Sequence, residues 1–174
     1  MKRFILLLFI ATLFVSASYA QKQGEAHIGG NLKFALSTSG SNGYTTTGTY
    51  LNIAPEYGYF ITDMLKVGAE INYEVSSKAH SVVLSPNITY YYQIINKLYY
   101  TPQLSIGGGV GIYSGYVAGI FSSTLNLVSF EYRPTEKWGI ATSLISLNYN
   151  LIDKTESVNF NAFYSPSVGF RYYF

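Results

Sequence analysis

Two histidines and no cysteine limit the chemistry that this sequence could carry out. Without cysteine there is no thiol nucleophile, no disulfide and no thiolate metal ligand. A serine hydrolase needs a serine, a histidine and an acid in contact, and the sequence offers one such set: His80, Ser81 or Ser76, and Glu74. Adjacent residues of a strand point to opposite faces, which separates His80 from Ser81. We therefore expect no catalytic site, no cofactor and no metal ion shared by His80 and His27, which we place on opposite rims.

Charged side chains are the second candidate for a functional site. They make up 11% of the sequence, under half of the roughly 25% found in soluble domains. Four acids and four bases fall on the polar faces of alternating segments, so their charges balance. Our hypothesis is that these side chains form an ion network inside a closed sheet, with Lys33 beside Glu56 and with Arg171 joining where the first and last strands meet. The alternative is that each charge is separately hydrated by water inside the sheet. The eight residues are Lys33, Glu56, Lys66, Glu70, Glu74, Glu131, Arg133 and Arg171.

The elements that must position these side chains are strands. Between residues 65 and 76 every second residue is apolar or aromatic, and strict alternation of this kind indicates a strand with two different faces. We predict eight antiparallel strands. Ile145 and Leu147 fall out of phase with Ile140, which predicts a bulge in the seventh strand. The strand ranges are 27–36, 49–60, 65–76, 80–94, 98–113, 118–133, 138–149 and 159–174.

Four prolines lie within the predicted strands. Proline has no N–H group and cannot donate to a strand ladder, and a closed barrel has no free edge where this loss would be harmless. We therefore expect bulges or lost ladder bonds at these positions, which are Pro55, Pro86, Pro102 and Pro166.

The first twenty residues have the features of a secretory signal peptide. A basic start at Lys2 and Arg3 is followed by an apolar stretch over residues 4–15, and Ser18 and Ala20 are small residues before Gln21. We expect cleavage after Ala20, leaving one domain over residues 21–174. Without Lys2 and Arg3 the 11 bases fall to nine, equal to the nine acids. No basic surface then remains for nucleic acid.

The apolar face of the sheet could meet either lipid or a protein core. A soluble eight-stranded barrel would show the same alternation, but its water-facing side would carry more charge. Long strands, scarce charge and aromatic residues near the strand ends favour a membrane. We predict an all-β fold, an eight-stranded antiparallel up-and-down transmembrane β-barrel. Its lumen should be filled by side chains, because eight strands leave little space inside.

The connections between the predicted strands alternate in length. Residues 62–63, 96–97 and 135–137 form tight turns, whereas residues 37–48 and 150–158 are longer and rich in Ser, Thr, Gly and Asn. Outer-membrane barrels have short periplasmic turns and longer outer loops. We therefore expect residues 37–48 and 150–158 to be exposed loops at the cell surface, where they could meet an extracellular ligand.

Two segments resemble the outer-membrane protein β-barrel domain family, which includes small barrels similar to OmpX and the OmpA transmembrane domain. They are Pro55–Gly68, with a Gly-Tyr-Phe strand end, a Thr-Asp turn and a Leu-x-Val-Gly strand, and Pro166–Phe174, which looks like the last strand of the family. The resemblance implies a bacterial outer-membrane location, contact with outer-membrane lipid and lipopolysaccharide, and assembly by the barrel-assembly machinery. It also assigns the terminal aromatic signal for that machinery to Phe174.

Three functions are compatible with such a barrel. The first is a structural or surface-interaction role, which we expect for a closed lumen in a monomeric barrel. The second is passage of small solutes or hydrophobic compounds. The third is modification of lipid A, as in deacylase-like barrels, for which His80 is the one histidine near the outer rim. The motifs are structural, so they support the fold and do not select an activity.

Overall fold

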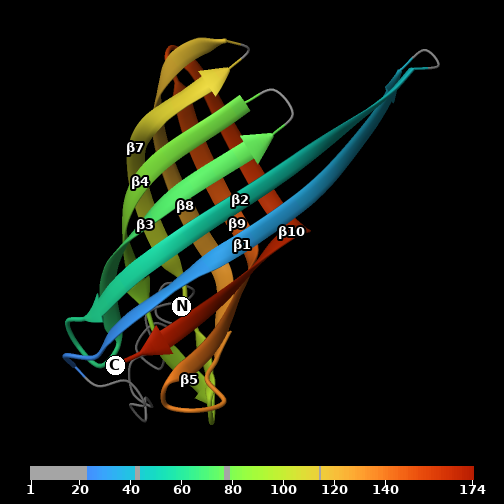
Figure 1. The fold of residues 1–174 in the computed structure, drawn as a ribbon. Coiled ribbons are helices and arrows are strands. Elements are labelled where there is room, and N and C mark those ends of the chain that lie inside the picture. The colour runs from blue at the N-terminus through green and yellow to red at the C-terminus, as the bar shows by residue number, and fades with distance from the viewer. Residues whose placement is uncertain (1–22, 42–43, 77–78, 114) are drawn as a thin grey trace, which may run out of the picture.

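The computed structural model describes residues 23–41, 44–76, 79–113 and 115–174, and the predicted signal peptide lies outside these ranges. Strands form almost all of the described chain (Figure 1). Among the described residues no helix is long and apolar enough to cross a membrane. The strands are β1 (Ala26–Ser41), β2 (Tyr44–Phe60), β3 (Leu65–Ser76), β4 (Ala79–Tyr90), β5 (Tyr92–Ile95), β6 (Leu98–Tyr100), β7 (Gln103–Tyr113), β8 (Tyr116–Tyr132), β9 (Trp138–Ile152) and β10 (Thr155–Tyr173).

These segments form a closed antiparallel barrel of eight strands. β4 and β5 are one strand interrupted at Tyr91, and β6 and β7 are one strand interrupted at Thr101 and Pro102. Each of these eight strands pairs with the strands before and after it in the sequence, and β1 pairs with β10 and closes the sheet. The predicted fold class is confirmed, because the alternating pattern places polar residues inside and apolar residues outside.

β4 shows this alternation most clearly. Ser81, Ser85 and Asn87 are buried in the lumen, while Val82 and Leu84 are exposed on the outer face. Apolar side chains on the outside of a closed sheet have no protein to pack against, and lipid is the solvent that makes this arrangement favourable. The fold is therefore that of a transmembrane β-barrel.

The prolines are accommodated as predicted. The pairing of β2 with β3 skips Ala54 and Pro55, and the pairing of β4 with β7 skips Ser85 and Pro86. Pro102 lies in the break between β6 and β7. Pro166 lies in the register shift between Ala162 and Ser167 of β10, and the predicted bulge of the seventh strand appears as register shifts between Asn126 and Ser129 of β8 opposite β9.

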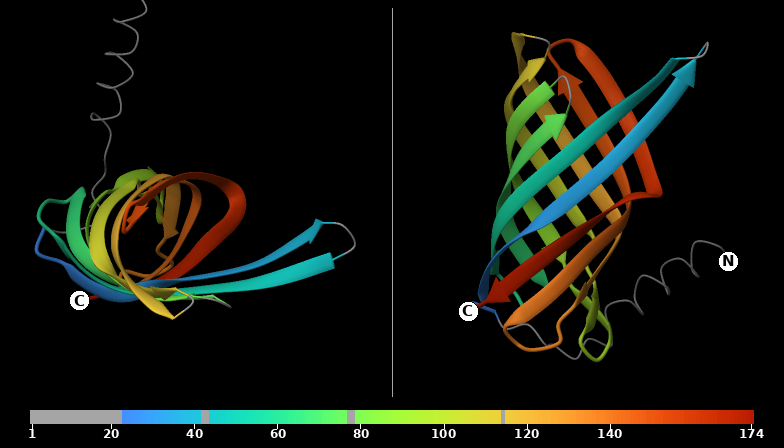
Figure 2. Two further views of the ribbon diagram at one scale, coloured as in Figure 1. Left: turned by 90° about the horizontal axis from the view of Figure 1, so that it is seen from above. Right: turned by 45° about the vertical axis from the view of Figure 1, so that its right-hand side comes forward.

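The prediction that residues 37–48 and 150–158 form loops is wrong, because most of these residues lie in strands. Residues 37–48 continue the β1–β2 ladder from Ser37 opposite Gly48 to Ser41 opposite Tyr44, and residues 150–158 continue the β9–β10 ladder to Ile152 opposite Thr155. In residues 37–48 the threonines are β-branched and suit strands, while both faces are mostly polar and show no apolar alternation. In residues 150–158 the charged side chains of Asp153, Lys154 and Glu156 interrupt the alternation. Figure 2 shows that the β1–β2 hairpin leans away from the barrel wall.

The two ends of the barrel can be told apart by the strands that begin or finish there. Ala26 and Phe174 exchange backbone hydrogen bonds at one end, with the short connections 61–64, 96–97 and 133–137 beside them. We call this end the terminal rim. The opposite end, where the hairpins β1–β2, β3–β4, β7–β8 and β9–β10 turn, is the hairpin rim.

Candidate functional site

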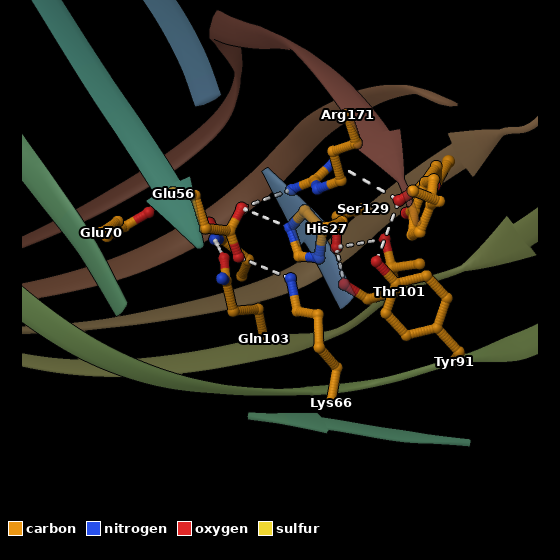
Figure 3. Close-up of polar contacts among 12 residues, drawn as sticks. His27, Glu56, Lys66, Glu70, Tyr91, Thr101, Gln103, Ser129 and Arg171 are labelled. Carbon is orange, nitrogen blue, oxygen red and sulfur yellow. Dashed lines mark hydrogen bonds and ion pairs between the residues drawn. The ribbon is translucent and has the colours of Figure 1, made fainter. Parts of the chain in front are cut away.

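The lumen near the terminal rim is filled by an ion network. Lys66 Nζ lies 2.5 Å from Glu56 Oε1, and Arg171 Nη2 donates to Glu56 Oε2 at 3.1 Å. The other Arg171 nitrogen, Nη1, lies 3.4 Å from Glu131 Oε2. Two carboxylates and two cations thus neutralise one another across β2, β3, β8 and β10. Figure 3 shows Glu56 between Lys66 and Arg171. Side chains of Glu56, Lys66 and Glu131 are fully buried, and only a paired arrangement makes such burial affordable.

Aromatic side chains close the lumen next to this network. Phe60, Tyr91, Tyr99 and Tyr173 are buried and pack together. The ring centroids of Phe60 and Tyr91 lie 4.9 Å apart in an edge-to-face arrangement, which is a favourable geometry for aromatic pairs. The hydroxyl groups of Tyr91 and Tyr173 both donate to Glu131, the former at 2.9 Å. The rings therefore fill space and also complete the hydrogen bonding of a buried carboxylate.

His27 lies at the terminal-rim end of β1 and His80 at the hairpin-rim end of β4, as predicted, but the His27 side chain points inward and joins this assembly. Its side chain is fully buried, with Nε2 3.8 Å from Glu56 Oε2 and its ring 5.3 Å from that of Tyr173. Space for it comes from Gly58, where a Cβ atom would lie 2.2 Å from His27 Cε1. Alternation along β1 could have found His27, because it shares the inward face with Asn31 and Lys33.

We call these nine residues the plug: His27, Glu56, Phe60, Lys66, Tyr91, Tyr99, Glu131, Arg171 and Tyr173. A second ion pair covers the plug at the terminal rim. Arg133 Nη2 donates to Glu25 Oε1 at 3.1 Å, and its guanidinium lies 3.6 Å from the centre of the Tyr173 ring. Glu25, which precedes the first predicted strand, was missed by the sequence analysis.

The lumen toward the hairpin rim holds a polar cavity of about 450 Å³, which we call the outer cavity. Amide and hydroxyl side chains make up most of its wall. They interact with one another, as where Thr124 donates to Asn148 at 3.0 Å and Asn126 donates to Gln103 at 3.0 Å. Its asparagines are Asn31, Asn52, Asn72, Asn126, Asn148, Asn150, Asn159 and Asn161, and its serines are Ser81, Ser85, Ser105, Ser122, Ser143, Ser146, Ser157 and Ser167.

Three charged residues line the outer cavity. Glu74 accepts a hydrogen bond from the Tyr50 hydroxyl at 2.7 Å, and Glu70 accepts one from Asn72 Nδ2 at 3.0 Å. Lys33 interacts electrostatically with Glu74. With two carboxylates and one ammonium group, these three residues carry one net negative charge when ionised.

The eight predicted charges are thus divided between three places. Glu56, Lys66, Glu131 and Arg171 lie in the plug, Lys33, Glu70 and Glu74 lie in the outer cavity, and Arg133 lies at the terminal rim. The prediction that Lys33 and Glu56 are cross-strand neighbours is wrong. Lys33 lies opposite Asn52, and Glu56 lies opposite Gly29 and Glu70 on its two neighbouring strands. Alternation fixes the face of each residue but leaves the register open.

The candidate hydrolase set is not assembled. His80 is exposed on the outer face, whereas Ser81 is buried in the lumen and its hydroxyl lies 3.5 Å from Glu74 Oε2. Among the described residues no group of three or more histidines and acids is placed to hold a metal ion.

No family model and no curated protein sequence matches this chain. Solved structures do match. The N-terminal β-barrel domain of Pseudomonas aeruginosa OprF is 13% identical with a TM-score of 0.53, covering 88% of this chain and 100% of that one. Neisserial surface protein A is 15% identical with a TM-score of 0.53, covering 86% of this chain and 98% of that one. This likeness confirms, at the level of the fold, the predicted resemblance to small outer-membrane barrels.

Proposed function

We propose that the chain is an integral outer-membrane barrel that does not conduct solutes and that has a structural or surface-interaction role. Its apolar outer face and its likeness to bacterial outer-membrane barrels support this location. The terminal rim, with its short connections, would face the periplasm. The hairpin rim would then face the exterior, and the β1–β2 hairpin would reach furthest from the wall (Figure 2).

The plug is the observation that carries this proposal. A continuous water path would have to pass Glu56, Lys66 and Glu131, whose side chains are fully buried. Eight strands give a lumen just wide enough for side chains to fill. Removal of one charged side chain would leave its partners buried without a counter-charge, which is costly. The ion network therefore also keeps the lumen closed.

Planar-bilayer recording tests the proposal. The wild-type barrel should remain silent, while Tyr91→Ala combined with Tyr173→Ala should produce discrete conductance steps, because two buried rings of the plug are lost. Tyr57→Ala combined with Tyr59→Ala is the matched control, since both rings lie exposed on the outer face. Sustained wild-type conductance would contradict the proposal and favour the solute-passage alternative.

The membrane location needs its own test. Outer-membrane extract should contain the mature chain, and unboiled protein should migrate differently from boiled protein on a gel, because a closed barrel resists unfolding by detergent. A water-soluble chain whose migration does not depend on heating would contradict the location.

The proposed assembly signal is Phe174. Its side chain is exposed on the outer face and stacks with Tyr172 at 6.4 Å between ring centroids. Phe174→Ala should reduce the amount of heat-modifiable barrel in cells, whereas Phe170→Ala, another exposed aromatic on β10, should reduce it less. The two variants should refold equally well in detergent, which separates recognition by the assembly machinery from barrel stability.

A further inference from the structure

The boundary between β1 and β10 is paired over only part of its length. Six residue pairs join the two strands, from His27 opposite Tyr173 to Leu32 opposite Val168. Beyond this point β1 remains paired with β2 as far as Ser41, and β10 remains paired with β9 as far as Thr155. Within the described ranges, each strand then has a single neighbour. We call residues 33–41 of β1 and 155–167 of β10 the seam; the left-hand view of Figure 2 shows the two strands diverging there.

The seam begins within the apolar band of the barrel. Six pairs of tilted strands rise about 15 Å along the barrel axis, whereas the apolar band of such barrels is about 25 Å tall. Large apolar side chains also continue beyond the last pair. Phe34 on β1 and Phe160 and Phe163 on β10 are all exposed, by 59%, 64% and 66%. The unpaired strand edges therefore extend through the half of the band nearer the hairpin rim.

Open strand edges are costly at this depth. Each unpaired backbone N–H or C=O group in hydrocarbon costs several kcal/mol, so polar groups are needed beside the seam. On the lumen side they are present: Lys33 from β1 and Asn159 and Asn161 from β10 line the outer cavity. The seam thus joins a polar cavity on one side to an apolar surface on the other.

We propose that the seam admits the head group of a neutral glycolipid sideways from the outer leaflet into the outer cavity. Sugar hydroxyls donate and accept hydrogen bonds, as do the amide and hydroxyl groups of the wall. The net negative charge of Glu70, Glu74 and Lys33 disfavours a phosphate head group. The acyl chains would remain outside, against Phe34 and Phe160. The proposal rests on the proposed function only in requiring a barrel folded in a bilayer.

Lipid quenching of tryptophan fluorescence tests the proposal. The chain has a single tryptophan, Trp138, at the terminal rim. Trp138→Phe combined with Phe160→Trp moves the reporter to the seam. In phosphatidylcholine vesicles, monogalactosyl diacylglycerol with brominated chains should quench this reporter at a mole fraction about tenfold lower than phosphatidylglycerol with the same chains, the effect of one to two hydrogen bonds. The two lipids should quench Trp138 of the wild-type chain equally.

Two variants of the reporter protein locate the binding site. Lys33→Cys with Ser167→Cys extends the β1–β10 register by one pair, so oxidation should staple the seam and abolish the preference for galactolipid. Leu125→Cys with Leu147→Cys is the matched control, because these residues are partners in the paired β8–β9 ladder. Oxidation of the control should leave the preference unchanged. Asn159→Leu with Asn161→Leu should abolish the preference without a staple.

Several outcomes would overturn the proposal. Equal quenching by the two lipids at position 160 would remove the specificity, and a preference that survives the staple would remove the lateral entry. A covalent dimer of the single variant Lys33→Cys would show that a second copy pairs with the open edge. Heat-dependent gel migration of each variant reports the folded barrel separately.

Discussion

The two halves of the lumen solve the problem of polar groups inside a membrane in opposite ways. The plug has fully buried charges that are paired with one another and covered by aromatic rings. The outer cavity has mainly uncharged side chains around open space, and its carboxylates accept hydrogen bonds from Tyr50 and Asn72. Charged groups buried away from water, as in the plug, need partners of opposite charge. In a hydrated cavity, uncharged amide and hydroxyl side chains can line the wall because water completes their hydrogen bonds. The comparison predicts that equivalent substitutions cost more in the plug than in the cavity.

Removal of one carboxylate should show the largest difference. Glu56→Gln leaves Lys66 and Arg171 with Glu131 as their one remaining buried carboxylate in the network, so it should lower the free energy of unfolding by about 3–5 kcal/mol. Glu70 is the cross-strand partner of Glu56, and Glu70→Gln should cost less than about 1 kcal/mol because the cavity is hydrated. Urea unfolding in lipid vesicles measures both. Equal costs would show that the two halves are equally wet.

Loss of a tyrosine hydroxyl should show the next largest difference. Tyr173 donates to Glu131 in the plug, and Tyr50 donates to Glu74 in the outer cavity. Tyr173→Phe should cost about 1.5–3 kcal/mol, because a buried hydrogen bond to a charged group is lost, whereas Tyr50→Phe should cost under about 1 kcal/mol because water can replace the hydroxyl. The same unfolding measurement compares them. A larger cost for Tyr50→Phe than for Tyr173→Phe would contradict the conclusion that the plug, and not the outer cavity, excludes water.

Packing in the plug can be tested with glycine substitutions. At Gly58 a new Cβ atom would lie 2.2 Å from the His27 ring, whereas at Gly108 nothing lies within 4 Å. Gly58→Ala should therefore cost about 1–3 kcal/mol through overpacking. Gly108→Ala, a change of the same size on the outer face, should leave the midpoint of urea unfolding nearly unchanged. Full tolerance of alanine at position 58 would mean that His27 is loosely held.

The ion pair at the terminal rim should show the smallest effect. Glu25 is 20% exposed while Arg133 is buried, and Arg133 keeps the Glu136 carbonyl as an acceptor when the carboxylate is lost, so the pair should contribute about 1 kcal/mol, the upper end of the range for solvent-accessible pairs. Glu25→Gln should lower the free energy of unfolding by that amount at low salt and by less at 1 M salt, at which charges are screened beyond roughly 3 Å. The cost of Glu56→Gln should change little with salt. Strong salt dependence at Glu56 would show that the plug is open to solvent.

Alternation was sufficient to predict the strands, because the two faces of each strand meet different surroundings. Strand length, scarce charge and aromatic residues near the strand ends were also needed to predict a transmembrane barrel. Alternation also predicted the proline irregularities and the shift in the seventh strand, since these are breaks in a regular pattern. It did not predict the length of the hairpins at residues 37–48, where both faces are mostly polar, and at residues 150–158, where Asp153, Lys154 and Glu156 interrupt the pattern.

The site was harder to predict, because neighbours across strands depend on register. The sequence placed Glu56, Lys66 and Arg171 on inward faces, but only the strand pairing brings Lys66, and not Lys33, to Glu56. Tyr91 and Tyr173 were not distinguished from the outward aromatics beside them, although their positions in the alternation put them inside. His27 was correctly placed at one rim because it begins a strand, but its burial was not predicted, because the plug extends to the strand ends.

Accessibility of two serines tests the central claim most directly. Ser129 and Ser146 are both 7% exposed, but Ser129 lies beside the plug and donates to the Thr101 carbonyl, whereas Ser146 lines the outer cavity. The wild-type chain has no cysteine, so Ser129→Cys and Ser146→Cys each introduce one thiol. A small cationic methanethiosulfonate reagent should modify the thiol at position 146 in the folded barrel and leave that at position 129 unmodified. Equal modification at both positions would contradict a lumen that is dry at one end and wet at the other.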